Sequence, residues 1–153
     1  MTVLVAVDET ERSKRAIETA YDLATSYDDS LVVLHVIPQE EFEAHQNAIT
    51  DIPGFAEYSL PQQESGAREF ARRFATETLG ADSTDRIQPR GRVGDISTEI
   101  LDEVTSSNPR YLVIAGRRRS PTRKALFGDT AQTILLNADC PVVTCMADSV
   151  GSE

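Results

Sequence analysis

The chain has 153 residues and a mass of 16.8 kDa, which suits one domain, because a domain of this size buries roughly two-thirds of its unfolded surface. Acidic residues outnumber basic residues by 25 to 15, and the resulting net charge of −10 excludes a general attraction to nucleic acid or anionic lipid. No apolar run approaches about 18 residues, and no basic leader precedes the first one. We therefore expect a cytoplasmic protein without a membrane span.

The basic residues are almost all arginines, since Lys14 and Lys124 are the only lysines in the sequence. An acidic, lysine-poor composition suggests a source with high internal salt, and our hypothesis is a halophilic archaeon. The two cysteines, Cys140 and Cys145, lack the spacing of metal ligands and are expected to be small buried thiols. No metal site is predicted.

Apolar runs alternate along the chain with segments of helical periodicity. Unbroken aliphatic runs are typical of parallel strands covered on both faces, and they predict strands at 3–7, 31–34, 111–115 and 142–146, with a weaker one at 87–93. Apolar residues at helical spacing predict helices over 16–24, 67–75, 96–104 and 131–138. Because crossovers between parallel strands are right-handed, this order predicts an α/β fold: one doubly wound, five-stranded, mostly parallel sheet with helices on both faces.

The predicted domain covers residues 1–147, and residues 148–153 are expected to form a flexible tail. A long connection spans residues 38–61, between the second strand and the second helix. A connection of this length is either a functional flap or a mobile loop without a role.

In a sheet of this kind, ligands bind at the carboxyl ends of the strands, where the direction of winding reverses. The residues directly after the first, second and fourth strands should line that crevice: Asp8, the segment 35–37 with Val36 at its centre, and Gly116. The Asp8 carboxylate either accepts a hydrogen bond from a ligand's amino group or caps the first helix beside Thr10.

A concentration of positive charge follows the fourth strand, where the segment 116–124 contains five basic residues. Three of them are candidates to neutralise a phosphate: Arg119, Arg123 and Lys124. Gly128 follows, and the next helix opens at Asp129 and Thr130. A glycine beside free backbone N–H groups at a helix N-terminus favours an anion, so this segment suggests a phosphate cradle. The alternative is a solvated basic loop that pairs with surrounding carboxylates.

Five short motifs occur in a fixed order along the whole chain. They are Val5-Ala6-Val7-Asp8 with Ser13 downstream, Leu34-His35-Val36, Val93-Gly94-Asp95, Val113-Ile114-Ala115-Gly116, and Asn137-Ala138-Asp139-Cys140-Pro141-Val142. Together they resemble the universal stress proteins. The resemblance implies a doubly wound α/β fold, a role in stress response, frequent dimerisation through the last strand and, in one branch of the family, ATP bound through a loop of pattern G-x2-G-x9-G-[S/T].

By position, the resemblance implies that Asp8 and the Val36 backbone contact the adenine or ribose. It makes Gly116 the first glycine of the loop and Gly128 the last. The chain departs from the pattern because Arg119 replaces the second glycine, and only eight residues separate it from the last one.

The sharpest departure is Asp129, which replaces the hydroxyl residue that contacts phosphate, while Thr130 stands one place later. A carboxylate about 4 Å from a phosphate charge costs about 4 kcal/mol at an effective dielectric of 20. The arginines of the loop can offset this repulsion. Asp129 can alternatively hold Mg²⁺ that bridges to phosphates, or pair with Arg123 and close an empty site.

The sequence contains no P-loop, no GxGxxG after the first strand and no nucleophile elbow. The histidines His35 and His45 have no serine or cysteine placed with them, so no catalytic residue is nominated. The last strand, 141–146, is apolar, and pairing of two such edges predicts a homodimer.

Our interpretation is a homodimeric universal-stress-type module that binds ATP. The alternatives are an interaction protein of the same fold, whose degenerate basic loop engages an acidic partner, and a weak Mg²⁺-dependent ATP hydrolase.

Overall fold

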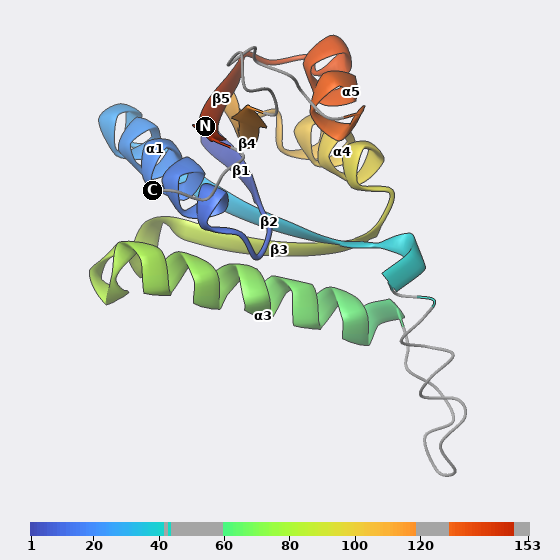
Figure 1. The fold of residues 1–153 in the computed structure, drawn as a ribbon. Coiled ribbons are helices and arrows are strands. Elements are labelled where there is room, and N and C mark those ends of the chain that lie inside the picture. Colours follow the sequence, from blue (N-terminus) through green and yellow to red (C-terminus); the bar gives the residue numbers. More distant parts are fainter. Residues whose placement is uncertain (42, 44–59, 119–128, 149–153) are drawn as a thin grey trace.

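The computed structural model describes residues 1–41, 43, 60–118 and 129–148, with side chains throughout except at 60, 82–84, 117–118 and 147–148 (Figure 1). Most of the long connection 38–61 and all but the first residue of the tail 148–153 therefore lie outside the described residues, as do 119–128. Within the described ranges, no helix is both long and apolar enough to cross a bilayer.

Five strands form one sheet in the order β3-β2-β1-β4-β5, and every neighbouring pair is parallel. Their bounds are β1 Thr2–Val7, β2 Ser30–Pro38, β3 Ile87–Gly94, β4 Tyr111–Arg118 and β5 Val142–Asp148. The chain moves outward from β1 through β2 to β3, then returns to the other side of β1 for β4 and β5. This reversal confirms the predicted doubly wound α/β fold, with a sheet that is wholly rather than mostly parallel.

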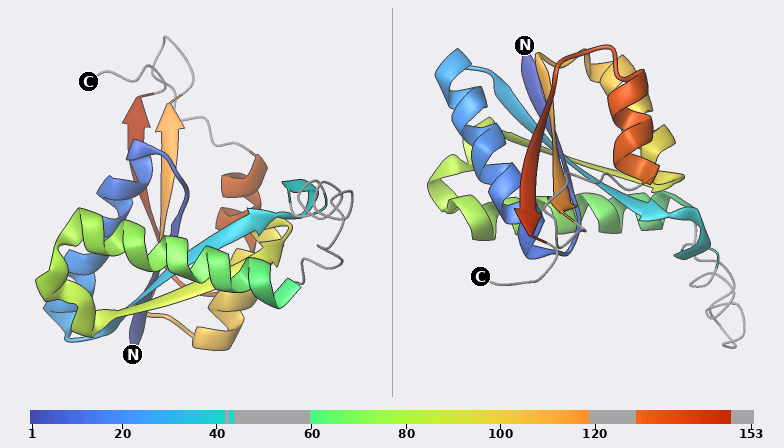
Figure 2. Two further views of the ribbon diagram at one scale, coloured as in Figure 1. Left: turned by 90° about the horizontal axis from the view of Figure 1, so that it is seen from below. Right: turned by 45° about the horizontal axis from the view of Figure 1, so that its top comes forward.

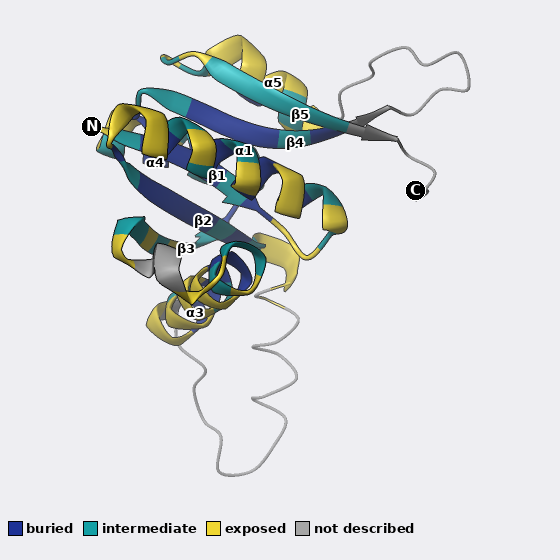
Figure 3. Cartoon of the chain, turned by 90° about the vertical axis from the view of Figure 1, so that its left-hand side faces the viewer, coloured by how far each residue is buried: buried dark blue, intermediate teal, exposed yellow. Residues whose placement is uncertain are grey.

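Helices cover both faces of the sheet (Figures 1 and 2). One face packs against α1 Glu11–Tyr27 and α3 Leu60–Leu79, and the other packs against α4 Ile96–Ser107 and α5 Asp129–Asn137. A short 3-10 helix, η1 Ala81–Arg86, leads from α3 into β3. Alternate residues of β1 point to opposite faces, so Val3 and Val5 join the α1 side while Leu4 joins the α4 side. Figure 3 shows how far the central strands are buried, and burial on both sides explains why each of them carries a continuous apolar run.

Two strands extend further than their apolar runs predict. The β2 ladder continues with Val36 paired to Arg92 of β3, and the β4 ladder continues with Gly116 paired to Met146 of β5. The segment 35–37 and Gly116 were expected to follow their strands, but they lie within them, because backbone pairing to a neighbouring strand continues where the apolar run stops.

At the end of the sheet where the strands begin, a buried carboxylate connects neighbouring strands. Asp29, which is 4% exposed, accepts a hydrogen bond of 2.8 Å from Nε of Arg110 and lies 3.6 Å from the Met1 ammonium. The hydrogen bond from Arg110 holds the pKa of Asp29 below its ordinary value, although burial alone would raise it. This contact ties the start of β2 to the start of β4.

Candidate functional site

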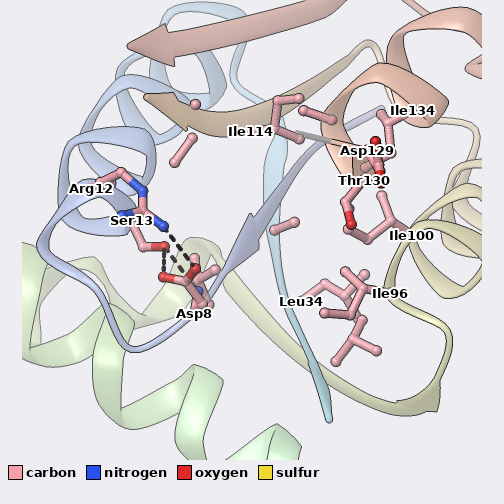
Figure 4. Close-up of a pocket in the computed structure, with 16 residues that line it drawn as sticks. Asp8, Arg12, Ser13, Leu34, Ile96, Ile100, Ile114, Asp129, Thr130 and Ile134 are labelled. Carbon is pink, nitrogen blue, oxygen red and sulfur yellow. Dashed lines mark hydrogen bonds and ion pairs between the residues drawn. The ribbon is translucent and has the colours of Figure 1, made fainter. Parts of the chain in front are cut away.

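A cavity of about 350 Å³ opens at the carboxyl ends of β1, β2 and β4, where the winding reverses (Figure 4). Helices α1, α4 and α5 complete its walls. Its apolar part is lined by Leu34, Val36, Ile96, Ile100, Ile114 and Ile134. Its polar part is lined by Asp8, Arg12, Ser13, Asp129 and Thr130. Apolar walls with a few convergent polar groups are typical of sites for small organic ligands.

The turn that leaves β1 is built around the Asp8 carboxylate. Its Oδ1 accepts hydrogen bonds from the Thr10 backbone N–H at 2.9 Å, from the Thr10 hydroxyl at 2.5 Å and from the Ser13 hydroxyl at 2.9 Å. The Asp8 backbone N–H in turn donates to Oγ of Ser13 at 2.9 Å. Ser13 is 1% exposed, so this reciprocal pair fixes Asp8 against the start of α1.

Of the two roles considered for Asp8, the structure shows a local one through Oδ1. Thr10 is the N-cap residue of α1 but makes no side-chain capping bond, so Asp8 rather than Thr10 organises this helix start. The second oxygen, Oδ2, lies 3.7 Å from a terminal nitrogen of Arg12. Partial burial raises the pKa of Asp8, but the hydrogen bonds from Thr10 and Ser13 together with the Arg12 charge outweigh it, and the net pKa lies below the ordinary value. Asp8 is therefore an anion at neutral pH.

The other polar side of the cavity is the start of α5. Helix α5 begins at Asp129, and both Asp129 and Thr130 line the cavity. In Figure 4 these two side chains lie across the cavity from Asp8, Arg12 and Ser13. The α5 amide groups favour an anion here, whereas the Asp129 carboxylate opposes one, so the Thr130 hydroxyl is the uncharged donor of this side.

The structure brings together five of the residues that the sequence nominates, namely Asp8, Val36, Gly116, Asp129 and Thr130. The other four, Arg119, Arg123, Lys124 and Gly128, lie outside the described residues. At Gly116, a Cβ atom would lie 2.9 Å from Sδ of Met146 and 3.1 Å from Cγ2 of Thr144, so β5 crowds this position.

Sequence reasoning missed Arg12 as a residue of the site. Arg12 lies four residues after Asp8, on the first turn of α1, and this spacing places both on the same side of the helix start. The isoleucines of α4 and α5 were recognised as helical core residues, but their periodicity does not distinguish the core from a cavity wall.

His35 has partners of its own outside the cavity. Its Nδ1 lies 2.9 Å from the Val7 carbonyl oxygen, and its ring packs 4.3 Å from the ring of Phe70. Over the described residues, no group of three or more His, Cys, Asp or Glu side chains is arranged to hold a metal ion.

Comparisons with known proteins bear on both the fold and the cavity. The model of the Universal stress protein family matches residues 1–145. The universal stress protein UspA from Lactobacillus plantarum is 20% identical, with a TM-score of 0.64 over 95% of this chain and 97% of that chain. A universal stress protein from Archaeoglobus fulgidus in complex with dAMP is 16% identical, with a TM-score of 0.57 over 94% of this chain and 96% of that chain.

A further universal stress protein, solved in complex with cAMP, is 15% identical, with a TM-score of 0.61 over 94% of both chains. At these identities the likeness shows the fold. Among curated proteins, none matches this sequence significantly.

Proposed function

Because the chain belongs to the universal stress protein family, we propose that its cavity binds an adenine nucleotide, with ATP as the ligand that the sequence predicts. The observation that carries this proposal is the cavity itself, which lies at the reversal point of the sheet and joins apolar walls to two polar sides. The structures of two family members in complex with cAMP and dAMP support the choice of an adenine nucleotide.

We assign the base to the apolar part of the cavity, beside Val36 and the Asp8 side chain. Gly116 would allow the ribose to approach the backbone of β4. Thr130 would donate to the ligand from the α5 side, and Asp129 would hold Mg²⁺ when the ligand carries several phosphates. In this proposal Gly128 would permit the backbone to approach the ligand closely, and the basic residues that would neutralise phosphate are Arg119, Arg123 and Lys124.

The second candidate is an interaction protein that keeps the fold and has lost the nucleotide. The Asp129 carboxylate favours this reading, because it lines the cavity at the helix N-terminus where a phosphate would otherwise bind. In that case the basic loop after β4 engages an acidic partner. A weak hydrolase is a third candidate, and it requires Mg²⁺-dependent phosphate release that falls in Asp129→Ala.

We also propose a cytoplasmic homodimer formed through residues 141–146. The two edges of the sheet differ in a way that supports this interface. The β3 edge carries Pro89, Arg90 and Arg92, which discourage pairing with another strand, whereas β5 has neither proline nor charge from Val142 to Met146. Sedimentation at several concentrations tests it: a species of twice 16.8 kDa is expected, and a monomer at high concentration would contradict it.

The test of binding is calorimetric titration with ATP, with and without Mg²⁺, at moderate and high KCl. Two variants of α5 locate the site. In Ala131→Phe, the added ring projects from a residue that lines the cavity, and in Gln132→Phe the same ring is added at an exposed neighbour. We expect saturable binding that Ala131→Phe abolishes and Gln132→Phe retains, with both variants folded by circular dichroism. No heat at millimolar ATP in any salt would reject nucleotide binding and favour the interaction protein.

A further inference from the structure

Two tyrosine side chains lie together at the end of the sheet where the strands begin, away from the cavity. Tyr27 is the last residue of α1, and Tyr111 is the first residue of β4. Their hydroxyl oxygens lie 3.4 Å apart, and their ring centroids lie 6.0 Å apart with the ring planes inclined at 49°. We propose that this pair is a site of oxidative modification, at which a one-electron oxidant joins the two rings as dityrosine. The proposal is independent of nucleotide binding.

An arginine holds the Tyr27 ring in place. The guanidinium carbon of Arg110 lies 4.1 Å from the centroid of this ring. Nε of Arg110 donates to the buried Asp29 carboxylate at 2.8 Å, and the Arg110 backbone N–H donates to the Thr2 carbonyl oxygen at 2.7 Å. Both the side chain and the backbone of Arg110 are thereby fixed. Because Tyr111 directly follows Arg110, one short stretch of chain positions both the cation and the second phenol.

The backbone that follows Tyr27 is also fixed. Asp28 ends α1 in the left-handed conformation, with a φ of 57°, and the Asp29 backbone N–H donates to the Ala24 carbonyl oxygen at 2.8 Å. The Arg86 guanidinium donates to the Asp29 carbonyl oxygen at 2.7 Å. The two rings are therefore held as neighbours by the fold, which favours a reaction within one chain over a reaction between chains.

The pair is accessible to an oxidant in solution. Tyr27 is 45% exposed, so a small oxidant can reach its ring directly. The hydrogen bond with Tyr27 raises the pKa of Tyr111, so Tyr111 is a protonated phenol at neutral pH. Its oxidation to a neutral radical therefore releases a proton as well as an electron.

The reaction consumes two oxidising equivalents. Each phenol loses one electron and one proton and becomes a tyrosyl radical. The two radicals form a carbon–carbon bond between ring positions next to the hydroxyl-bearing carbons. The hydrogen on each of these positions then moves to a phenol oxygen, which restores both aromatic rings. The chain loses two hydrogen atoms in total, and the oxidant takes up two electrons.

The cross-link would join residues that lie 84 positions apart in the sequence. A covalent link that closes a long loop restricts the unfolded chain, as a disulfide does. It would therefore fasten the C-terminal end of α1 to the sheet and make the oxidised chain more resistant to unfolding.

The test exposes dilute protein to photogenerated tris(bipyridine)ruthenium(III), a one-electron oxidant, with persulfate as the electron acceptor that is reduced to sulfate. We expect dityrosine fluorescence from a monomeric chain whose mass has fallen by two hydrogen atoms, and a proteolytic product that joins Tyr27 to Tyr111. Tyr27→Phe and Tyr111→Phe each keep the ring but lack the phenol, so both should lose this product while remaining folded by circular dichroism. The matched control is Tyr21→Phe on the same helix, which should retain the product.

Oxidation of the urea-unfolded chain should give much less of the intrachain product, because the two residues are then no longer neighbours. An equal yield from the unfolded chain, an unchanged product in Tyr27→Phe, or dityrosine found only in cross-linked dimers would overturn the proposal, as would the absence of dityrosine. The oxidised protein should also unfold at a higher urea concentration than identically treated Tyr27→Phe. Equal midpoints would overturn the conclusion that the link fastens α1 to the sheet.

Discussion

Gly91 is the position where a single methyl group should do most damage to the packing of α3 on β3. A Cβ atom there would lie 2.8 Å from Cβ of Ala67 and closer still to the Glu64 carbonyl oxygen and the Arg68 backbone nitrogen. Two of these three atoms belong to the helix backbone, so no side chain can rotate away, and α3 itself must move. Overpacking of this kind costs about 1–3 kcal/mol, and rigid neighbours place Gly91→Ala at the upper end.

An alanine also restricts the unfolded chain, which returns about 0.4–1 kcal/mol, so the net loss of unfolding free energy should be about 2 kcal/mol. Urea unfolding followed by circular dichroism measures it. The matched control is Gly66→Ala on the exposed side of α3, where an added Cβ atom would meet nothing within 4 Å. The higher helix propensity of alanine should raise the unfolding free energy of this variant by about 1 kcal/mol. If Gly91→Ala is within about 0.5 kcal/mol of the unmodified protein, α3 does not lie this close to β3.

Three further changes test the packing and charges around the cavity and the sheet. Ile134→Ala should cost about 3 kcal/mol in urea unfolding, because this side chain is 1% exposed, whereas Leu136→Ala on the same helix, 75% exposed, should cost less than about 0.5 kcal/mol. Ser13→Ala should cost about 1–2 kcal/mol, because it leaves the Asp8 backbone N–H without its acceptor; an unchanged midpoint would contradict the hydrogen-bonded turn. Because the pKa of Asp29 is lower in the folded chain than its ordinary value of 3.8, ionised Asp29 stabilises the fold above that value, and this stabilisation is lost as the pH falls through the folded pKa. The difference in unfolding free energy between the unmodified protein and Asp29→Asn should therefore narrow from about pH 5 to about pH 2. A difference that stays constant over this range would refute the prediction.

The fold was predictable because the central strands are buried on both faces. A strand between two helical layers has no solvent side, so the buried parts of β1, β2 and β4 are continuous apolar runs, which distinguishes them from a helix. The edge strand β3 was a weaker prediction because Arg90 and Arg92 interrupt its apolar pattern. These two side chains form ion pairs with the acidic residues Glu99 and Glu103 of α4. Arg92 in particular is a paired side chain that is 25% exposed, and periodicity alone does not reveal such pairing.

The candidate site was predictable only where topology decides it. The carboxyl ends of parallel strands meet at one end of the sheet, so Asp8, Val36 and Gly116 had to lie near one another whatever their chemistry. Arg12 follows from a different cause, the direction of the first turn of α1, which depends on the hydrogen bonds that Asp8 makes to Ser13. A turn that is fixed by side-chain hydrogen bonds leaves no periodic pattern of apolar residues in the sequence. The sequence therefore predicted Asp8 as a residue of the site but not Arg12 beside it.

The charges around the cavity distinguish a site that works by long-range attraction from one that works by contact. If the protein operates at high internal salt, as its acidic, lysine-poor composition suggests, charges separated by more than about 3 Å are largely screened at 1 M salt. Attraction that acts over a longer distance then contributes little to phosphate binding, and the repulsion from Asp129 also weakens. A donor that meets the phosphate directly keeps its hydrogen bonds under the same conditions. Nucleotide binding that persists in high KCl would therefore identify a site that works by direct contact, whereas binding that disappears with salt would identify one that depends on long-range attraction.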